Sequence, residues 1–186
     1  VRVATDSDRI ASLVEAHGGL AVLTPSEISS GTDRVAQVDR QLGKERADIY
    51  VNFQGDEPFL EPESVEAALA LVVKGFFSMA TLATELLPEE RDQPSAVKVT
   101  LGADGRALNF SRSPLPGALR HLGLYVYRRD VLQRITSLPQ SPNELRERLE
   151  QLRAHDDGVA IGVARVHSQS FGIDTPIDLA RAEQMA

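Results

Sequence analysis

Apolar and polar residues alternate along the chain with two different periods, and the changes between them predict a succession of strands and helices. Short apolar runs rich in β-branched residues are typical of strands, whereas apolar positions three or four residues apart are typical of amphipathic helices. Strands are predicted over residues 20–23, 49–53, 79–84, 96–101, 107–110, 122–127 and 159–166. Helices are predicted to begin at Asp6 or Ser7 and within residues 29–34, and to cover residues 62–73, 130–135, 144–155 and 176–185.

The order of these elements favours an α/β fold. Strands that alternate with helices form parallel sheets joined by helical crossovers, so a doubly wound sheet is predicted. Residues 79–127 depart from this order, because strands follow one another there and two of them are joined by a hairpin connection at residues 102–105. We therefore expect a mixed, mostly parallel sheet with an antiparallel excursion. No internal repeat or long linker divides residues 1–186, which predicts a single domain.

Composition excludes several classes of function. Of the 186 residues, 42% are hydrophobic and 25% are charged, close to the average for soluble globular proteins. The formal net charge of −7 argues against a nucleic-acid partner, and the chain has no apolar run of about 18 residues that would span a membrane. Cysteine is absent, which excludes disulfides and thiolate metal sites and fits a reducing compartment, so we expect a cytoplasmic protein.

The turn after the strand at residues 49–53 carries the most specific chemistry. Its sequence is Gln54-Gly55-Asp56-Glu57-Pro58, which places carboxylates at the carboxyl end of a buried strand. Open α/β sheets bind ligands at this edge, and carboxylate oxygens there suit Mg²⁺ held against phosphates. The alternative interpretation is an acidic surface turn.

Asp174 stands directly before the last predicted helix and is a candidate second metal ligand. Two aspartates from separate segments that converge on one Mg²⁺, with water and phosphate oxygens completing the coordination, are a common arrangement. An aspartate at a helix entrance is also an ordinary N-cap, so both interpretations stay open.

The helix start at residues 29–34 is a candidate anion or nucleoside site. It offers hydroxyls, a glycine for close backbone approach and free N–H groups. The same residues would also serve as a plain helix cap. The candidate binding residues here are Ser30, Gly31, Thr32, Asp33 and Arg34.

Three further segments carry candidate binding residues. Arg112 ends a strand against a Pro-rich loop, where it would fork onto a carboxylate or remain a surface cation. His121, Gly123 and Tyr125 share one strand face, and the small glycine leaves room there for a polar ligand, although a buried His and Tyr are often purely structural. Glu150 and Gln151 lie on a charged helix, for which a solvated face is the alternative interpretation.

Nine short segments, taken together and in order, resemble the 3-deoxy-manno-octulosonate cytidylyltransferases, also called CMP-Kdo synthetases. Each is a weak signal alone, but they run nearly from end to end of the chain. The segments are Val3-Ala4-Thr5-Asp6, Ser30-Gly31-Thr32-Asp33-Arg34, Gln54-Gly55-Asp56-Glu57-Pro58, Met79-Ala80-Thr81-Leu82, Ala96-Val97-Lys98-Val99, Phe110-Ser111-Arg112, His121-Leu122-Gly123-Leu124-Tyr125, Leu149-Glu150-Gln151-Leu152-Arg153 and Asp174-Thr175-Pro176.

The resemblance implies an enzyme that transfers a cytidylyl group from CTP to Kdo, giving CMP-Kdo and pyrophosphate for lipopolysaccharide biosynthesis. It implies a Rossmann-like nucleotide-diphospho-sugar transferase fold of the glycosyltransferase-A type, Mg²⁺ dependence and a homodimer. By the family pattern Asp56 and Asp174 hold magnesium and are the catalytic residues. The same pattern assigns Ser30, Gly31, Thr32, Asp33 and Arg34 to the cytidine side, and Gln54, Arg112, His121, Tyr125, Glu150 and Gln151 to the sugar acid.

Elementary chemistry agrees with those roles. Attack of a sugar hydroxyl on the α-phosphorus places negative charge on phosphoryl oxygens and on the departing pyrophosphate, which metal and cations stabilise. A metal-bound hydroxyl loses its proton readily, so no histidine base is required. We therefore expect His121 to bind substrate rather than to act as a general base.

Two features depart from the family pattern. The family begins with a strand and a cationic loop of the type Pro-Ala-Arg-x-x-Ser-x-Arg-Leu-Pro-Gly-Lys, and we expect both to be missing from this chain, which would then bind CTP poorly. The segment between Pro116 and His121 is also shorter than usual. Two rival functions stay open: a cytidylyltransferase for another acidic or amino-modified sugar, and a non-catalytic nucleotide-sugar binding relative.

Overall fold

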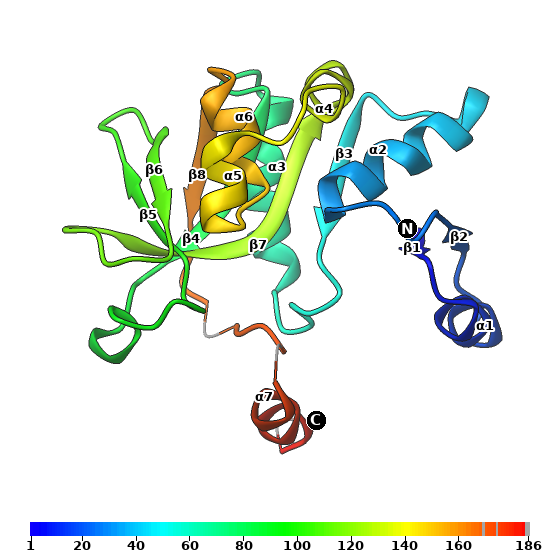
Figure 1. Cartoon of the computed structure of the whole chain (residues 1–186), viewed down its shortest axis with the longest axis horizontal. Coiled ribbons are helices and arrows are strands. Elements are labelled where there is room, and N and C mark those ends of the chain that lie inside the picture. Colours follow the sequence, from blue (N-terminus) through cyan, green and yellow to red (C-terminus); the bar gives the residue numbers. More distant parts are fainter. Residues whose placement is uncertain (169, 174, 185–186) are drawn as a thin grey trace.

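A computed structural model of the chain describes residues 1–168, 170–173 and 175–184 (Figure 1). Its strands are β1 (Val3–Thr5), β2 (Ala21–Leu23), β3 (Ile49–Phe53), β4 (Met79–Thr84), β5 (Lys98–Leu101), β6 (Ala107–Ser111), β7 (Leu119–Arg128) and β8 (Ile161–Arg165). Its helices are α1 (Asp8–Ala16), α2 (Gly31–Gln41), α3 (Pro62–Val73), α4 (Arg129–Thr136), α5 (Pro142–Glu147), α6 (Gln151–Asp156) and α7 (Pro176–Glu183), with short 3₁₀ turns at Gly43–Glu45 and Pro88–Glu90.

Strand β7 is the centre of the main sheet. It pairs antiparallel with β3, β4 and β5, while β8 joins β4 in parallel and β6 joins β5 antiparallel. Strands β3, β4 and β8 therefore run in one direction. Strands β1 and β2 form a separate parallel pair, which lies with α1 to one side of the main sheet (Figure 1). The mixed α/β fold predicted from the sequence is confirmed, and its antiparallel excursion supplies the central strand.

The main sheet is buried on both faces, and the period of two along β4 and β7 sorts their side chains between two cores. Leu82, Leu122 and Leu124 pack on one face with Ala68 and Val72 of α3. The neighbouring positions on the same strands pack on the other face, against α4 and α6. Figure 1 shows α3 behind the sheet and α5 and α6 in front of it. This second face is the one that carries the polar residues described below.

One predicted element is wrong. Residues 144–155 do not form a single helix, because α5 ends at Glu147 and its C-cap, Arg148, has a left-handed backbone with φ 54° and ψ 49°. A capping box between Ser141 and Glu144 fixes the start of α5, and α6 then begins at Gln151. The break turns the second half of the segment, including Glu150 and Gln151, toward the interior. None of the helices in the described part of the chain is long and apolar enough to cross a membrane.

Candidate active site

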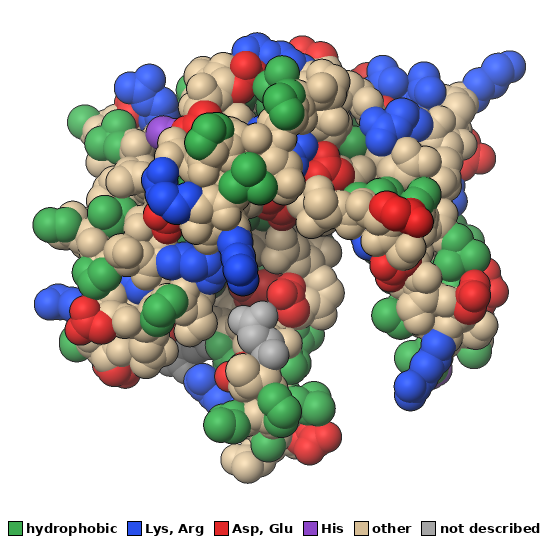
Figure 2. All heavy atoms as spheres, in the orientation of Figure 1, with side chains coloured by type: hydrophobic (Ala, Val, Ile, Leu, Met, Phe, Trp, Pro, Cys, Tyr) green, Lys and Arg blue, Asp and Glu red, His purple; other side chains and the backbone are tan. Residues whose placement is uncertain are grey.

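A cleft of ≈ 1120 Å³ lies beyond the carboxyl end of β3. The face in Figure 2 is hollowed below α5 and α6, and acidic and basic side chains border the hollow. The cleft is lined by the start of α2, the acidic turn after β3, the middle of β7, the α5–α6 break and the segment leading into α7. Of the residues that the sequence predicted, Ser30, Gly31, Gln54, Asp56, Arg112, His121, Tyr125, Glu150 and Gln151 line it.

The start of α2 is a helix cap that faces the cleft. The Ser30 hydroxyl accepts a hydrogen bond from the Asp33 amide at 3.1 Å, as expected of an N-cap. Thr32 points away from the cleft, and its hydroxyl lies 2.7 Å from the Tyr127 hydroxyl in the buried interior. The Thr32 amide nevertheless donates to a Glu150 carboxylate oxygen at 2.8 Å. The first turn of α2 is thus tied to the opposite wall of the cleft.

Asp33 and Arg34 hold α2 in place and do not line the cleft. Both carboxylate oxygens of Asp33 accept from the Arg153 guanidinium, at 2.8 and 3.0 Å, and the same guanidinium donates to Glu144 at 2.8 and 2.7 Å. Burial alone would raise the pKa of Asp33, but the hydrogen bonds from Arg153 and Ser30 bring that pKa below its ordinary value. Arg34 donates to the Thr24 hydroxyl and, at 3.3 Å, to Asp6.

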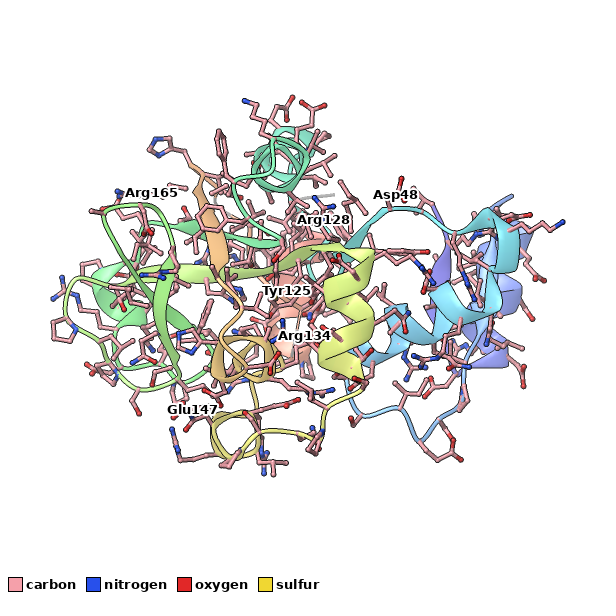
Figure 3. All side chains as sticks on the ribbon, turned by 90° about the horizontal axis from the view of Figure 1, so that it is seen from above. Asp48, Tyr125, Arg128, Arg134, Glu147 and Arg165 are labelled. Atoms are coloured by element: carbon pink, nitrogen blue, oxygen red, sulfur yellow. The ribbon has the colours of Figure 1, made fainter. Side chains whose placement is uncertain are left out.

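The wall formed by β7 and α6 is polar and largely satisfied from within the protein. Glu150 accepts from the Gln54 amide at 2.9 Å, and burial raises the pKa of its carboxyl. The Tyr125 hydroxyl donates to the Gln151 side-chain oxygen at 2.9 Å (Tyr125 lies at the centre of the view in Figure 3). Gln151 is only 1% exposed, and its amide nitrogen has no hydrogen-bond partner among the described residues. A buried donor of this kind is costly unless a ligand or water completes it.

His121 sits in the same wall as a neutral side chain. Its Nε2 lies 2.8 Å from the Thr81 hydroxyl, and its ring packs 5.5 Å from that of Tyr125, centroid to centroid. Burial lowers the pKa of His121 from its ordinary value of 6.5 to about 3. The imidazole is therefore uncharged near neutral pH, so it contributes hydrogen bonding and shape rather than positive charge.

Arg112 borders the cleft, but its guanidinium donates its hydrogen bonds to backbone carbonyls of the protein. Its three nitrogens donate to the carbonyls of Glu147 at 2.8 Å, Pro94 at 2.9 Å and Arg148 at 3.3 Å. The carbonyls at the end of a helix lack intrahelical partners, so Arg112 completes the C-terminus of α5. Figure 3 shows Glu147, beside this break, toward the periphery of the molecule.

The acidic turn presents Asp56 to the cleft and turns Glu57 inward. Asp56 is exposed, and its backbone oxygen accepts from the Ile173 amide at 2.8 Å. Asp174 lies outside the described residues. Thr175 is the N-cap of α7 and forms a capping box with Asp178.

Glu57 is a site residue that sequence reasoning missed. Its carboxylate accepts from the Gly123 amide at 3.2 Å and from the Ser170 hydroxyl at 3.0 Å. The glycine at position 123 is the sequence feature that could have indicated Glu57, because a larger residue would not fit there. A Cβ at Gly123 would lie 2.9 Å from the Gln54 side-chain oxygen and 3.3 Å from a Glu57 oxygen. Gly123 lines the cleft, and the side chains of Gln54 and Glu57 occupy the space directly beside its Cα.

The fold and the cleft are those of a nucleotidyltransferase. The chain belongs to the cytidylyltransferase family, whose sequence profile matches residues 1–161. Within that family it belongs with the 3-deoxy-manno-octulosonate cytidylyltransferases, as the sequence motifs predicted.

Two relatives and one solved structure define this similarity. The 3-deoxy-manno-octulosonate cytidylyltransferase of Paramagnetospirillum magneticum is 44% identical over 196 residues, which cover 100% of this chain and 80% of the relative. That of Anaeromyxobacter sp. strain Fw109-5 is 45% identical over 194 residues, which cover 100% of this chain and 78% of the relative. A solved structure of CMP:2-keto-3-deoxy-manno-octonic acid synthetase complexed with CTP matches with a TM-score of 0.91 and 41% identity, over 100% of this chain and 79% of that one.

Proposed function

We propose that this nucleotidyltransferase transfers a cytidylyl group from CTP to the anomeric hydroxyl of Kdo, forming CMP-Kdo and pyrophosphate. The observation that carries the proposal is the polar wall of the cleft, made by Gln54, Tyr125, Glu150 and Gln151, in a fold that matches a CTP-bound CMP-Kdo synthetase. A sugar acid with several hydroxyls needs such a wall of donors and acceptors. Among the described residues, the Gln151 amide nitrogen is a buried donor of this wall without a hydrogen-bond partner, which supports a polar ligand there.

The start of α2 supports a nucleotide position on the other side of the cleft. Ser30 and Gly31 line it at the N-terminus of a helix of 11 residues, where backbone N–H groups and the helix dipole favour anionic and polar ligands. In this proposal Thr32, Asp33 and Arg34 act by holding that turn, since their side chains bond to other side chains of the protein. Arg112 likewise shapes the cleft by completing the end of α5.

Asp56 and Asp174 are the residues that we expect to hold Mg²⁺. The described residues contain no group of three or more His, Cys, Asp or Glu side chains that would enclose a metal by themselves. An exposed Asp56, with the segment before α7 bonded to its backbone, fits an ion held by two carboxylates and completed by phosphate oxygens and water. Such an ion supplies stabilisation of negative charge on the phosphoryl oxygens.

The decisive experiment is pyrophosphate release from CTP with a panel of sugar acids. Turnover with Kdo, and little with other acidic or amino-modified sugars, supports the proposal. Turnover only with another sugar identifies a sibling cytidylyltransferase, and CTP binding without turnover identifies a binding protein. We also expect a homodimer and a cytoplasmic location, which light scattering of the purified protein and cell fractionation would test.

Substitution of Asp56 tests the metal role within that assay. We expect Asp56→Asn to abolish turnover and to leave the thermal unfolding curve unchanged, because the side chain is exposed. Asp130→Asn is the matched control, since Asp130 is an exposed carboxylate of α4 away from the cleft. Wild-type turnover in Asp56→Asn would refute the role.

A further inference from the structure

Glu57 bonds to two chain segments that border the cleft and lies in a third. It belongs to the turn at residues 54–57, where its own amide donates to the Gln54 carbonyl at 3.2 Å. One carboxylate oxygen accepts from the Gly123 amide in the middle of β7, and the other accepts from the Ser170 hydroxyl before α7. A single half-buried side chain therefore joins the acidic turn, the central strand and the segment 170–173.

Ser170 is held on its other side as well. Its backbone carbonyl accepts from the Arg120 guanidinium, and Arg120 is itself paired with Glu90 at 2.9 Å. Ser170 is only 2% exposed. The segment that leads into α7 is therefore bonded to the central strand β7 directly through Arg120 and indirectly, through the Glu57 side chain, at Gly123.

The acidic turn at residues 54–57 and the segment 170–173 also meet next to the cleft. The Ile173 amide donates to the Asp56 carbonyl at 2.8 Å, three residues beyond Ser170 and one residue before Glu57. The contact through Glu57 and the contact through Asp56 thus lie side by side. Loss of the first would leave the second, together with the stacked rings of Phe59 and Phe171 (5.2 Å between centroids), to hold the spacing between the acidic turn and the segment 170–173.

We propose that Glu57 is a positioning residue that sets the spacing between Asp56 and the segment before α7, and thereby the geometry in which this edge of the cleft binds a divalent cation with CTP. The proposal rests on the proposed function, and it adds a role for a side chain whose two oxygens are occupied by protein donors. Residues that orient metal ligands by hydrogen bonds change metal affinity or activity by about 10- to 100-fold when they are replaced.

The test uses Glu57→Gln and Ser170→Ala in the full chain. The glutamine keeps the size of Glu57 but removes its charge and one of its two acceptor oxygens. Its oxygen would accept from the Gly123 amide while its NH₂ group donates to the Ser170 hydroxyl, so both contacts become weaker, neutral hydrogen bonds. Ser170→Ala removes one contact and leaves the carboxylate in place. Glu63→Gln on the exposed start of α3 is the matched carboxylate-to-amide control.

Two measurements are made on each variant. The first is turnover of CTP and Kdo as a function of Mg²⁺ concentration, and the second is Mn²⁺ binding in the presence of CTP, followed by electron paramagnetic resonance. We expect Glu57→Gln to raise the half-saturating concentration of both ions at least tenfold, while the KM for CTP at saturating Mg²⁺ stays unchanged. Ser170→Ala should shift both half-saturating concentrations in the same direction by less, and the shift in the double variant should be smaller than the two single shifts combined.

Several results would overturn the proposal. A lower melting temperature in Glu57→Gln or Ser170→Ala with unchanged ion requirements would show a purely structural role. Additive shifts in the double variant would show that the two residues do not act through one contact. If the wild-type protein fails to convert Kdo, the proposed function falls, and Mn²⁺ binding, which needs no turnover, still decides the role of Glu57. If Glu57→Gln does not fold, Ser170→Ala decides it.

Discussion

Replacement of Arg153 by methionine should be among the most destabilising single changes in this chain. Arg153 is 5% exposed and lies between two carboxylates, Glu144 at 3% exposure and Asp33 at the start of α2. Its guanidinium joins three helices, α2, α5 and α6, through four hydrogen bonds of 2.7 to 3.0 Å. Methionine fills a similar volume but leaves both carboxylates without their cation.

The expected cost follows from that geometry. Removal of one partner from a buried ion pair costs about 3–5 kcal/mol, because the remaining charge stays desolvated. At about 2–4 °C per kcal/mol for a domain of this size, the melting temperature should fall by about 10 °C. Arg106→Met is the control, since Arg106 is exposed and lies 3.9 Å from the exposed Asp104. Such a surface pair is worth about 0–1 kcal/mol.

The pH dependence supplies an independent check. Because the pKa of Asp33 is below its ordinary value of 3.8 in the folded protein, its contribution is present above pH 3.8 and is lost as the pH falls through the folded value. In Arg153→Met burial is no longer opposed by the guanidinium, so the pKa of Asp33 rises and the carboxyl protonates more easily. Chemical denaturation from pH 7 to pH 4 should therefore show the gap between wild type and variant narrowing. A gap as small as that of Arg106→Met, or one that does not change with pH, would refute the reasoning.

Two further predictions concern the wall of the cleft. Gly123→Ala should lower kcat/KM by about tenfold or more with a modest loss of stability. The reason is that the new Cβ would lie 2.9 Å from the Gln54 side-chain oxygen and displace it. An unchanged kcat/KM in this variant would contradict the prediction. The pKa of His121 is about 3 in the folded protein and has its ordinary value of 6.5 in the unfolded chain. Between these two pH values the imidazole is therefore protonated in the unfolded chain and neutral in the folded protein. Stability should thus fall as the pH drops through that window, and His121→Gln should flatten this slope in urea titrations followed at successive pH values. An equal slope in both proteins would show that His121 does not cause it.

Much of the fold follows from local sequence signals. Residues 49–53, 62–73 and 79–84 were predicted with the bounds that the structure shows, because strongly apolar runs there are bordered by Gly, Pro or charged residues. The break at Arg148 was not predictable from periodicity, because it depends on Arg112, far away in the sequence, which binds the carbonyls at the end of α5. Likewise β7 starts earlier than its apolar run, at Leu119, because its first residues pair with β5.

The site was predicted by residue type better than by orientation. The motifs identified segments that line the cleft, but a motif does not indicate which of its side chains face a ligand. Asp33 was expected on the cytidine side and instead pairs with Arg153, whose position depends on how α6 packs on α2. Glu57 was passed over as part of an acidic turn, since its partners Gly123 and Ser170 come from distant segments.

The alternation along β7 has a consequence for how this protein can change. Leu122, Leu124 and Val126 pack in the core against α3, and of these three only Leu122 also borders the cleft, whereas His121, Gly123 and Tyr125 at the alternating positions line it. Strand β7 thus carries two alternating sets of positions: one set packs in the core against α3, and the other set lines the cleft. A mutational library restricted to the second set would explore new sugar acceptors with the α3 core untouched, and a library restricted to the first would tune thermal tolerance with the acceptor wall unchanged.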